Sequence, residues 1–205
     1  MDEILDGVLH WTAFHERIRQ PVHSYLHVAS GAVFDPLLPP DISPDALAAA
    51  AIPSVVLLSN RHHLRDAAPL AEAFGCRIRC HEAGLHEFSD HGQGPDVEGF
   101  AFGDTVAPGV TALEVGVLTP EDTAFHVAVG PGALLFADGL IRSDGELGFV
   151  GDELMGGDPE AVKAGLRERL GTLAEREDFD ALLFAHGEPL TSGGRAALRA
   201  FVARW

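Results

Sequence analysis

The sequence predicts an α/β protein from three observations. Three short apolar runs with strand character, residues 54–58, 133–137 and 181–185, each lead directly into polar side chains. Residues 41–80 alternate helix-like and strand-like segments, which is typical of parallel α/β layers. We find no internal repeat, low-complexity tract or linker. We therefore expect residues 1–205 to form a single α/β domain.

The first 80 residues predict a hairpin followed by alternating helices and strands. Residues 22–28 and 31–34 should pair as the hairpin, which Asp35-Pro36 would end. Residues 44–51 should form an alanine-rich helix with Ser43 as its N-cap. After the strand at 54–58, the expected elements are a helix at 64–74 that Gly75 caps and a strand at 76–80.

The rest of the chain predicts a long connection, a group of strands and two helices. Residues 82–108 are rich in Gly, His and acidic residues, and we expect an irregular loop that covers the cleft. Predicted strands follow at 110–118, 123–129, 133–136 and 179–185. Asp158 should cap a helix over 159–176, and a closing helix should run from Ser192 or Gly193 to Trp205.

Composition limits the classes of partner and the compartment. The net charge of −17 disfavours nucleic acid, because a phosphate backbone would be repelled. It disfavours an anionic membrane surface for the same reason, and the apolar runs fall far short of a bilayer span. The acidic start of the chain lacks the basic segment of a secretory signal. Cys76 and Cys80 are interpreted as free thiols, and we expect a cytoplasmic protein.

The polar side chains that follow the apolar runs are the candidate site. Ser59, Asn60 and His62 come after the first run, Asp138 after the second and His186 after the third. Side chains just beyond the carboxyl ends of strands are held by a rigid sheet, which is where α/β proteins place their sites.

These residues resemble the motifs of the metallo-β-lactamase-fold superfamily, whose first strand end carries Thr-His-x-His-x-Asp-His. Ser59 matches the Thr and His62 the second His, while Asp138 and His186 match the metal-bridging Asp and the final His. The resemblance covers nearly the whole chain in order and spacing. It implies a four-layer αβ/βα sandwich and a metallo-hydrolase.

Other motif positions depart from the family pattern. Asn60 stands at the first His, Leu64 at the Asp, Arg65 at the last His of the first motif, and Leu118 at the later His. When the family's ligand pattern is transferred to this sequence, each of the two metals keeps two ligands, which is too few for tight binding. Arg65 would also repel a divalent cation, so we expect it to replace a metal and pair with Asp138.

Two functional readings stay open. The first is an eroded di-zinc site without di-zinc hydrolysis and without a metal, whose cleft still binds a small molecule or a partner. The second is a mononuclear hydrolase of an ester, thioester or lactone, with one Zn, Fe or Mn ion on His62, Asp138 and His186. Asn60, His63, Arg65 and Asp66 would line the cleft. We interpret His63 as an exposed neighbour and Asp66 as a helix cap or the partner of a neighbouring Arg. A homodimer is compatible with the exposed edge strands.

Overall fold

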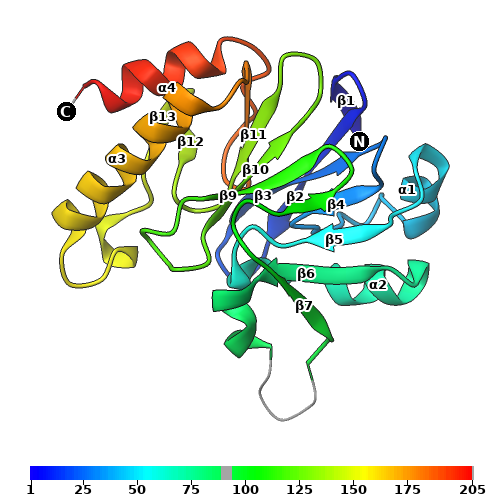
Figure 1. Ribbon diagram of the computed structural model, residues 1–205. Coiled ribbons are helices and arrows are strands. Elements are labelled where there is room, and N and C mark those ends of the chain that lie inside the picture. The colour runs from blue at the N-terminus through cyan, green and yellow to red at the C-terminus, as the bar shows by residue number, and fades with distance from the viewer. Residues whose placement is uncertain (89–93, 205) are drawn as a thin grey trace.

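The computed structural model describes residues 1–88 and 94–204, and its centre is a pair of facing β-sheets (Figure 1). The N-terminal sheet has seven strands in chain order, β1 to β7. The second sheet has five strands in the order β14-β11-β10-β9-β8, and β12 and β13 form a separate hairpin. Each sheet is therefore built from its own stretch of the chain.

The N-terminal sheet is antiparallel over β1–β4 and parallel from β4 to β7. Its strands are β1 Asp2–Leu5, β2 Val8–His15, β3 Gln20–His27, β4 Ala32–Phe34, β5 Val55–Leu57, β6 Arg77–His81 and β7 Val97–Phe100. The parallel part forms because helices α1 (Pro44–Ala50) and α2 (Ala67–Phe74) make the return connections.

The second sheet is antiparallel except for the pair β11 and β14. Its strands are β8 Thr105–Ala107, β9 Val110–Glu114, β10 Thr123–Val127, β11 Ala133–Phe136 and β14 Ala181–Phe184. Helix α3 (Pro159–Arg176) crosses between the parallel strands, helix α4 (Gly194–Val202) follows β14, and the hairpin consists of β12 Ile141–Ser143 and β13 Glu146–Gly148. The described residues also form the 3-10 turns η1 Arg61–His63, η2 Glu82–Glu87 and η4 Asp152–Leu154.

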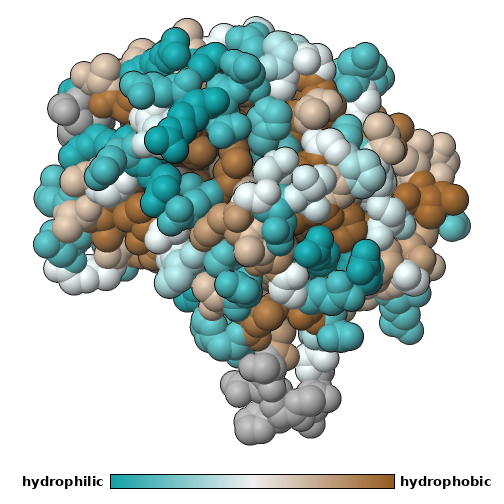
Figure 2. Space-filling view, in the orientation of Figure 1, coloured by the Kyte–Doolittle hydropathy of each residue, from teal (hydrophilic) through white to brown (hydrophobic). Residues whose placement is uncertain are grey.

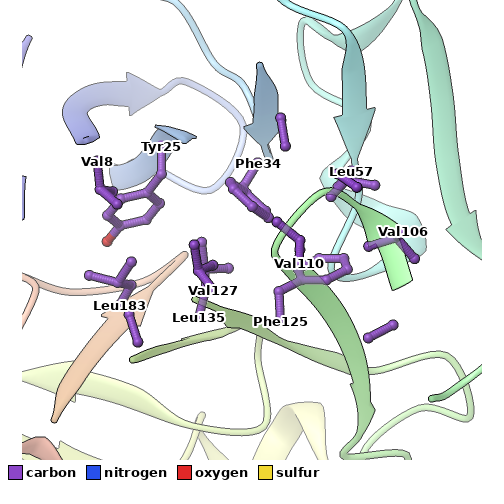
Figure 3. Packing of buried hydrophobic residues seen from close by; sticks show 14 of the residues in the cluster. Val8, Tyr25, Phe34, Leu57, Val106, Val110, Phe125, Val127, Leu135 and Leu183 are labelled. Carbon is purple, nitrogen blue, oxygen red and sulfur yellow. The ribbon is translucent and has the colours of Figure 1, made fainter. Parts of the chain in front are cut away.

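Three apolar clusters separate four layers. Helices α1 and α2 cover the outer face of the first sheet, and α3 and α4 cover the outer face of the second (Figure 1). Between the sheets, Tyr25, Phe34, Phe125 and Leu183 pack together (Figure 3). The burial of apolar side chains in such clusters is the main favourable contribution to the free energy of folding. The predicted four-layer αβ/βα sandwich is confirmed.

Most predicted elements lie where the sequence put them. Ser43 caps α1 and Asp158 caps α3, each by accepting a hydrogen bond from a backbone N–H of the first turn. The second helix begins at Ala67, three residues later than predicted, because residues 61–63 form the separate turn η1. The connection at 82–108 contains η2, β7 and β8, so it extends both sheets; its residues 89–93 lie outside the described part.

The surface alternates polar and apolar side chains. On the face in Figure 2, hydrophilic residues predominate over α3 and α4. Large exposed apolar side chains are dispersed over the described surface: Met1, Phe14, Ile18, Ile52 and Leu154. Within residues 1–88 and 94–204, no helix has the length and apolar character needed to cross a bilayer.

Candidate metal centre

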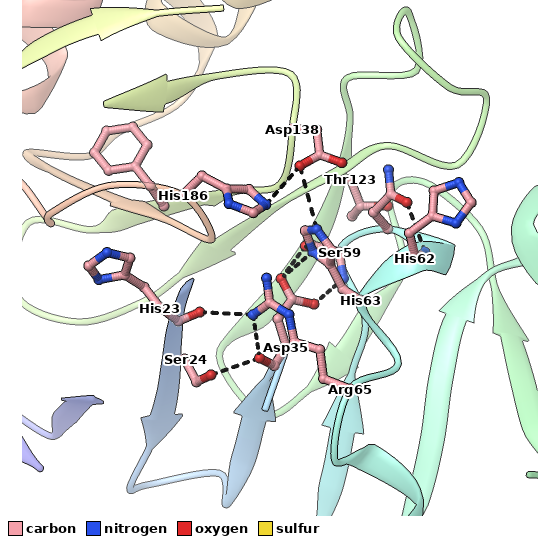
Figure 4. Close-up of polar contacts among 12 residues, drawn as sticks. His23, Ser24, Asp35, Ser59, His62, His63, Arg65, Thr123, Asp138 and His186 are labelled. Carbon is pink, nitrogen blue, oxygen red and sulfur yellow. Dashed lines mark hydrogen bonds and ion pairs between the residues drawn. The ribbon is translucent and has the colours of Figure 1, made fainter. Parts of the chain in front are cut away.

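Strand ends from both sheets meet at one point of the interface. Asp35 follows β4 and His63 lies in η1 just after β5, whereas Asp138 follows β11 and His186 follows β14. Figure 4 shows the Asp138 carboxylate between the two imidazoles. The site is thus assembled from two halves of the chain that fold as separate sheets.

Three side chains offer ligand atoms at metal-binding separations. Asp138 Oδ1 lies 3.1 Å from His186 Nε2 and 3.5 Å from His63 Nε2. All three ligand atoms lie within 4.8 Å of one another. Ligands at 2.0–2.2 Å around a tetrahedral ion are roughly 3.4 Å apart, so these separations suit one transition metal.

Asp35 orients His63 from the side away from Asp138. It is almost fully buried, and its Oδ2 lies 3.1 Å from His63 Nδ1. Its carboxylate also accepts hydrogen bonds from the backbone N–H and the hydroxyl of Ser59. A carboxylate on one ring nitrogen leaves the other nitrogen free to ligate, which is the usual support of a metal-binding histidine.

Charges in the cluster are strongly coupled. Burial would lower the pKa of His63, but Asp35 and Asp138 raise it to about 9. Burial would likewise raise the pKa of Asp138, yet His63 and His186 hold it well below its usual range. The pKa of His186 is lowered, chiefly by burial. Without a metal, His63 is therefore a cation between two carboxylates.

The turn η1 decides which histidine enters the site. Asn60 caps this turn, and its Oδ1 accepts from the backbone N–H of His62 at 3.0 Å. The turn directs His63 into the interface, where it is buried, so the interpretation of His63 as an exposed neighbour is wrong. The same turn leaves the His62 side chain exposed. The structure therefore brings together His63, Asp138 and His186, with the predicted ligand His62 outside the cluster (Figure 4).

Arg65 lies partly buried beside the cluster but has other partners than expected. Its Nη1 donates to the carbonyl of Asp35 at 2.8 Å and to that of His23 at 3.3 Å. Among the described residues, its hydrogen bonds and ion pairs do not include Asp138. The predicted pairing of Arg65 with Asp138 is wrong, because His63 occupies that position.

Two further predicted cleft residues have structural partners. Asn60 is buried and its Nδ2 donates to Thr119 Oγ1 at 3.2 Å. Asp66 lies at the start of α2, and its Oδ2 accepts from the backbone N–H of Leu38 at 2.7 Å. Asp66 therefore fixes the segment after Asp35; among the described residues its side chain makes no capping hydrogen bond to α2, so the predicted cap is wrong, and it is not part of the group of candidate ligands.

A second buried acid lies behind the cluster. Asp122 has no exposed surface, and neither carboxylate oxygen has a hydrogen-bond partner among the described residues. Burial, with Asp138 nearby, raises its pKa well above the usual range. The sequence analysis missed Asp122, which stands four residues after Leu118.

The sequence analysis also missed Asp35, although a signal for it is present. Asp35 follows an apolar strand, as Asp138 and His186 do. The Asp35-Pro36 pair also ends the hairpin, which is the role that the sequence pattern predicts for it. The pattern of an apolar strand leading into a polar side chain therefore applies four times in this chain.

Comparisons with known proteins support the fold. No family model matches the chain, and no curated protein matches it in sequence. A metallo-beta-lactamase family protein from Thermus thermophilus has a TM-score of 0.65 at 18% identity, over 98% of this chain and 80% of that protein. A beta-lactamase domain protein from Burkholderia ambifaria has a TM-score of 0.67 at 17% identity, over 99% of this chain and 74% of that protein. The chain has the metallo-β-lactamase fold.

A further structural neighbour was solved with metal bound. TTHA1623, solved in a di-iron-bound form, has a TM-score of 0.58 at 22% identity, over 94% of this chain and 93% of that protein. That protein holds two metal ions, whereas the described residues of this chain offer one group of three ligands. The donor set of two imidazoles and one carboxylate fits zinc, iron or manganese.

Proposed function

We propose that this protein is a metallo-hydrolase-like protein with a mononuclear centre on His63, Asp138 and His186. The observation that carries the proposal is the convergence of three ligand atoms, from both sheets, at separations that suit one ion. A metal bound there would lower the pKa of a water ligand and polarise a substrate carbonyl. An ester, thioester or lactone is the matching substrate class.

The surrounding residues favour one metal over two. Asp35 accepts the Nδ1 proton of His63 and directs Nε2 toward the ion. Arg65 places a permanent positive charge next to the Asp35 carbonyl, in a partly buried position. A second cation beside this guanidinium would be repelled, and the repulsion is strong at low dielectric.

A metal-free binding cleft is the second candidate function. It is favoured by the position of His63 between Asp35 and Asp138, which gives both carboxylates a cationic partner without a metal. In that case the interface between the sheets would bind a small molecule without hydrolysing it.

Metal content decides between the two candidates. We would purify the protein without added metal or chelator and measure its elements, together with His63→Ala, His186→Ala and the matched control His62→Ala. The proposal expects about one equivalent in the wild type and in His62→Ala, and loss in the other two variants. Asp35→Asn should weaken metal affinity about 10–100-fold. A wild type that stays metal-free after soaking with zinc would refute the mononuclear centre and leave the binding cleft.

A further inference from the structure

A cavity of about 630 Å³ adjoins the proposed metal centre. His186, one of the three ligands, lies in its wall together with His23 from β3 and Arg142 from the β12–β13 hairpin. Gln20, Ser143, Asp144 and Glu188 also line it. Its size is within the range of small-molecule sites. A molecule held there would have one end beside His186.

His23 is a buried polar group in this wall that a second histidine holds in place. The rings of His10 and His23 are stacked, with centroids 5.1 Å apart and an interplanar angle of 8°. His10 Nε2 and His23 Nδ1 are 2.8 Å apart, so one of them donates to the other. His23 is 1% exposed. His23 lines the cavity, and because Nδ1 is engaged by His10, Nε2 is the ring nitrogen left to bond a ligand.

The charges around the cavity disfavour an anionic ligand. Arg142 directs its guanidinium to three backbone carbonyls, those of Gly145, Glu188 and Pro189. The side chains of Asp144 and Glu188 are exposed, and among the described residues neither forms an ion pair with Arg142. Two carboxylates and one guanidinium therefore line the cavity, so its wall carries one more negative than positive charge, the histidines aside. A carboxylate or phosphate would meet net negative charge in a protein that is acidic throughout.

We infer that this cavity binds the body of a small uncharged carbonyl compound, an ester or a lactone, and that His23 is the residue that positions it by a hydrogen bond. The reacting carbonyl would lie on the side of His186. This assignment of the reacting end rests on the proposed function, whereas binding in the cavity does not.

A neutral and an anionic probe of similar size test the inference. The neutral probe is 2-pyrrolidinone, a lactam that cannot be hydrolysed as a lactone is, and the anionic probe is 4-hydroxybutyrate. The measurement is the ¹⁵N chemical shift of the histidine side chains, in protein as purified and after chelation. We expect 2-pyrrolidinone to shift His23 and His10 saturably in both samples. His81, which stacks on Phe102 and does not line the cavity, should not shift.

Two sets of variants separate positioning from general damage. His23→Phe keeps an aromatic ring against His10 but removes the hydrogen-bonding nitrogen, and it should weaken 2-pyrrolidinone binding at least tenfold. His62→Phe, at an exposed position, is the matched control and should bind like the wild type. Asp144→Asn with Glu188→Gln should strengthen 4-hydroxybutyrate binding several-fold and leave 2-pyrrolidinone binding unchanged. This exposed pair keeps the test valid if His23→Phe does not fold.

The outcomes separate the cavity from the metal centre. Equal affinity for the two probes, or unchanged binding in folded His23→Phe, would overturn the inference. Binding of 2-pyrrolidinone by a protein that never takes up metal would support the cavity and refute the hydrolase. A metal-loaded protein that does not respond to 2-pyrrolidinone would refute the cavity and leave the metal centre intact.

Discussion

Tyr25 of the first sheet bonds the second sheet next to the site. Removing its hydroxyl tests directly how the two sheets are held together. The hydroxyl donates to the carbonyl of Phe184 at 2.9 Å and accepts from the N–H of the same residue at 3.1 Å. Phe184 is the last residue of β14, an edge strand of the second sheet, and on its outer side Leu182 exchanges backbone hydrogen bonds with Leu190. At Phe184, two residues before His186, the Tyr25 hydroxyl takes the backbone groups instead.

Tyr25→Phe should destabilise the protein by about 3 kcal/mol. The variant removes two hydrogen bonds worth about 1 kcal/mol each and leaves a buried N–H and carbonyl unsatisfied. Tyr25 is 1% exposed, so water does not readily replace the hydroxyl. For a domain of this length, the loss corresponds to a fall in Tm of about 10 °C.

Urea and thermal unfolding, followed by circular dichroism, would measure this loss. The matched control is Thr172→Val, which removes a hydroxyl at the surface of α3 and should change stability by less than about 0.5 kcal/mol. Tyr25 is the sole tyrosine, so absorbance at 295 nm reports its ionisation alone. Burial raises its pKa far above the usual range, and the phenol should ionise only on unfolding. A loss below about 1 kcal/mol would mean that the Phe184 backbone groups find other partners.

Three further predictions follow from buried polar groups and from one turn. Burial lowers the pKa of His10 and of His23 from 6.5 to about 4, so their stabilising effect is complete above pH 6.5 and lost as the pH falls to 4. Urea unfolding should show this as a loss of about 3 kcal/mol, and the double variant His10→Gln with His23→Gln should lose less over the same range. The pKa of Asp122 is raised in the folded protein, so this carboxyl group lowers the stability of the folded state as the pH rises above 3.8. Metal-free Asp122→Asn should therefore be more stable than the wild type by about 1–3 kcal/mol at pH 8, and the difference should shrink toward pH 4. Gly132→Ala should lower Tm far more than Gly130→Ala in the same turn; both have positive φ, but only a Cβ on Gly132 would collide with the Asp178 carbonyl.

The sequence predicted the layers well because they depend on local patterns. Apolar runs of strand length, the Ser43 and Asp158 caps and the Gly75 terminus are each readable within a few residues. The four-layer arrangement came from the resemblance, since periodicity alone supports only an α/β class. The order of the strands along the chain does not indicate that β7 joins the first sheet and β8 the second.

The side chains that meet at the candidate site were predicted less completely, because which histidine enters it depends on a one-residue difference. Motif alignment assigned the ligand to His62, whereas Asn60 starts a 3-10 turn and three residues complete one turn of such a helix. Asn60 and His63 therefore share a face, and both are buried. Asn is a preferred cap residue, so the turn could have been predicted from Asn60. Arg65 bonds to backbone carbonyls, and every residue type carries a carbonyl, so the sequence does not indicate these partners.

The division of the site between two sheets has a consequence for how the protein assembles. Residues 1–100 build one sheet and residues 105–184 the other, so each can form largely from contacts within its own stretch of chain. His63 and Asp35 belong to the first stretch, while Asp138 and His186 belong to the second. The proposed ligand set would be complete only after the two stretches have docked. A metal that requires all three ligands would bind only the docked state. It would therefore stabilise that state relative to any partly folded form in which only one sheet has formed.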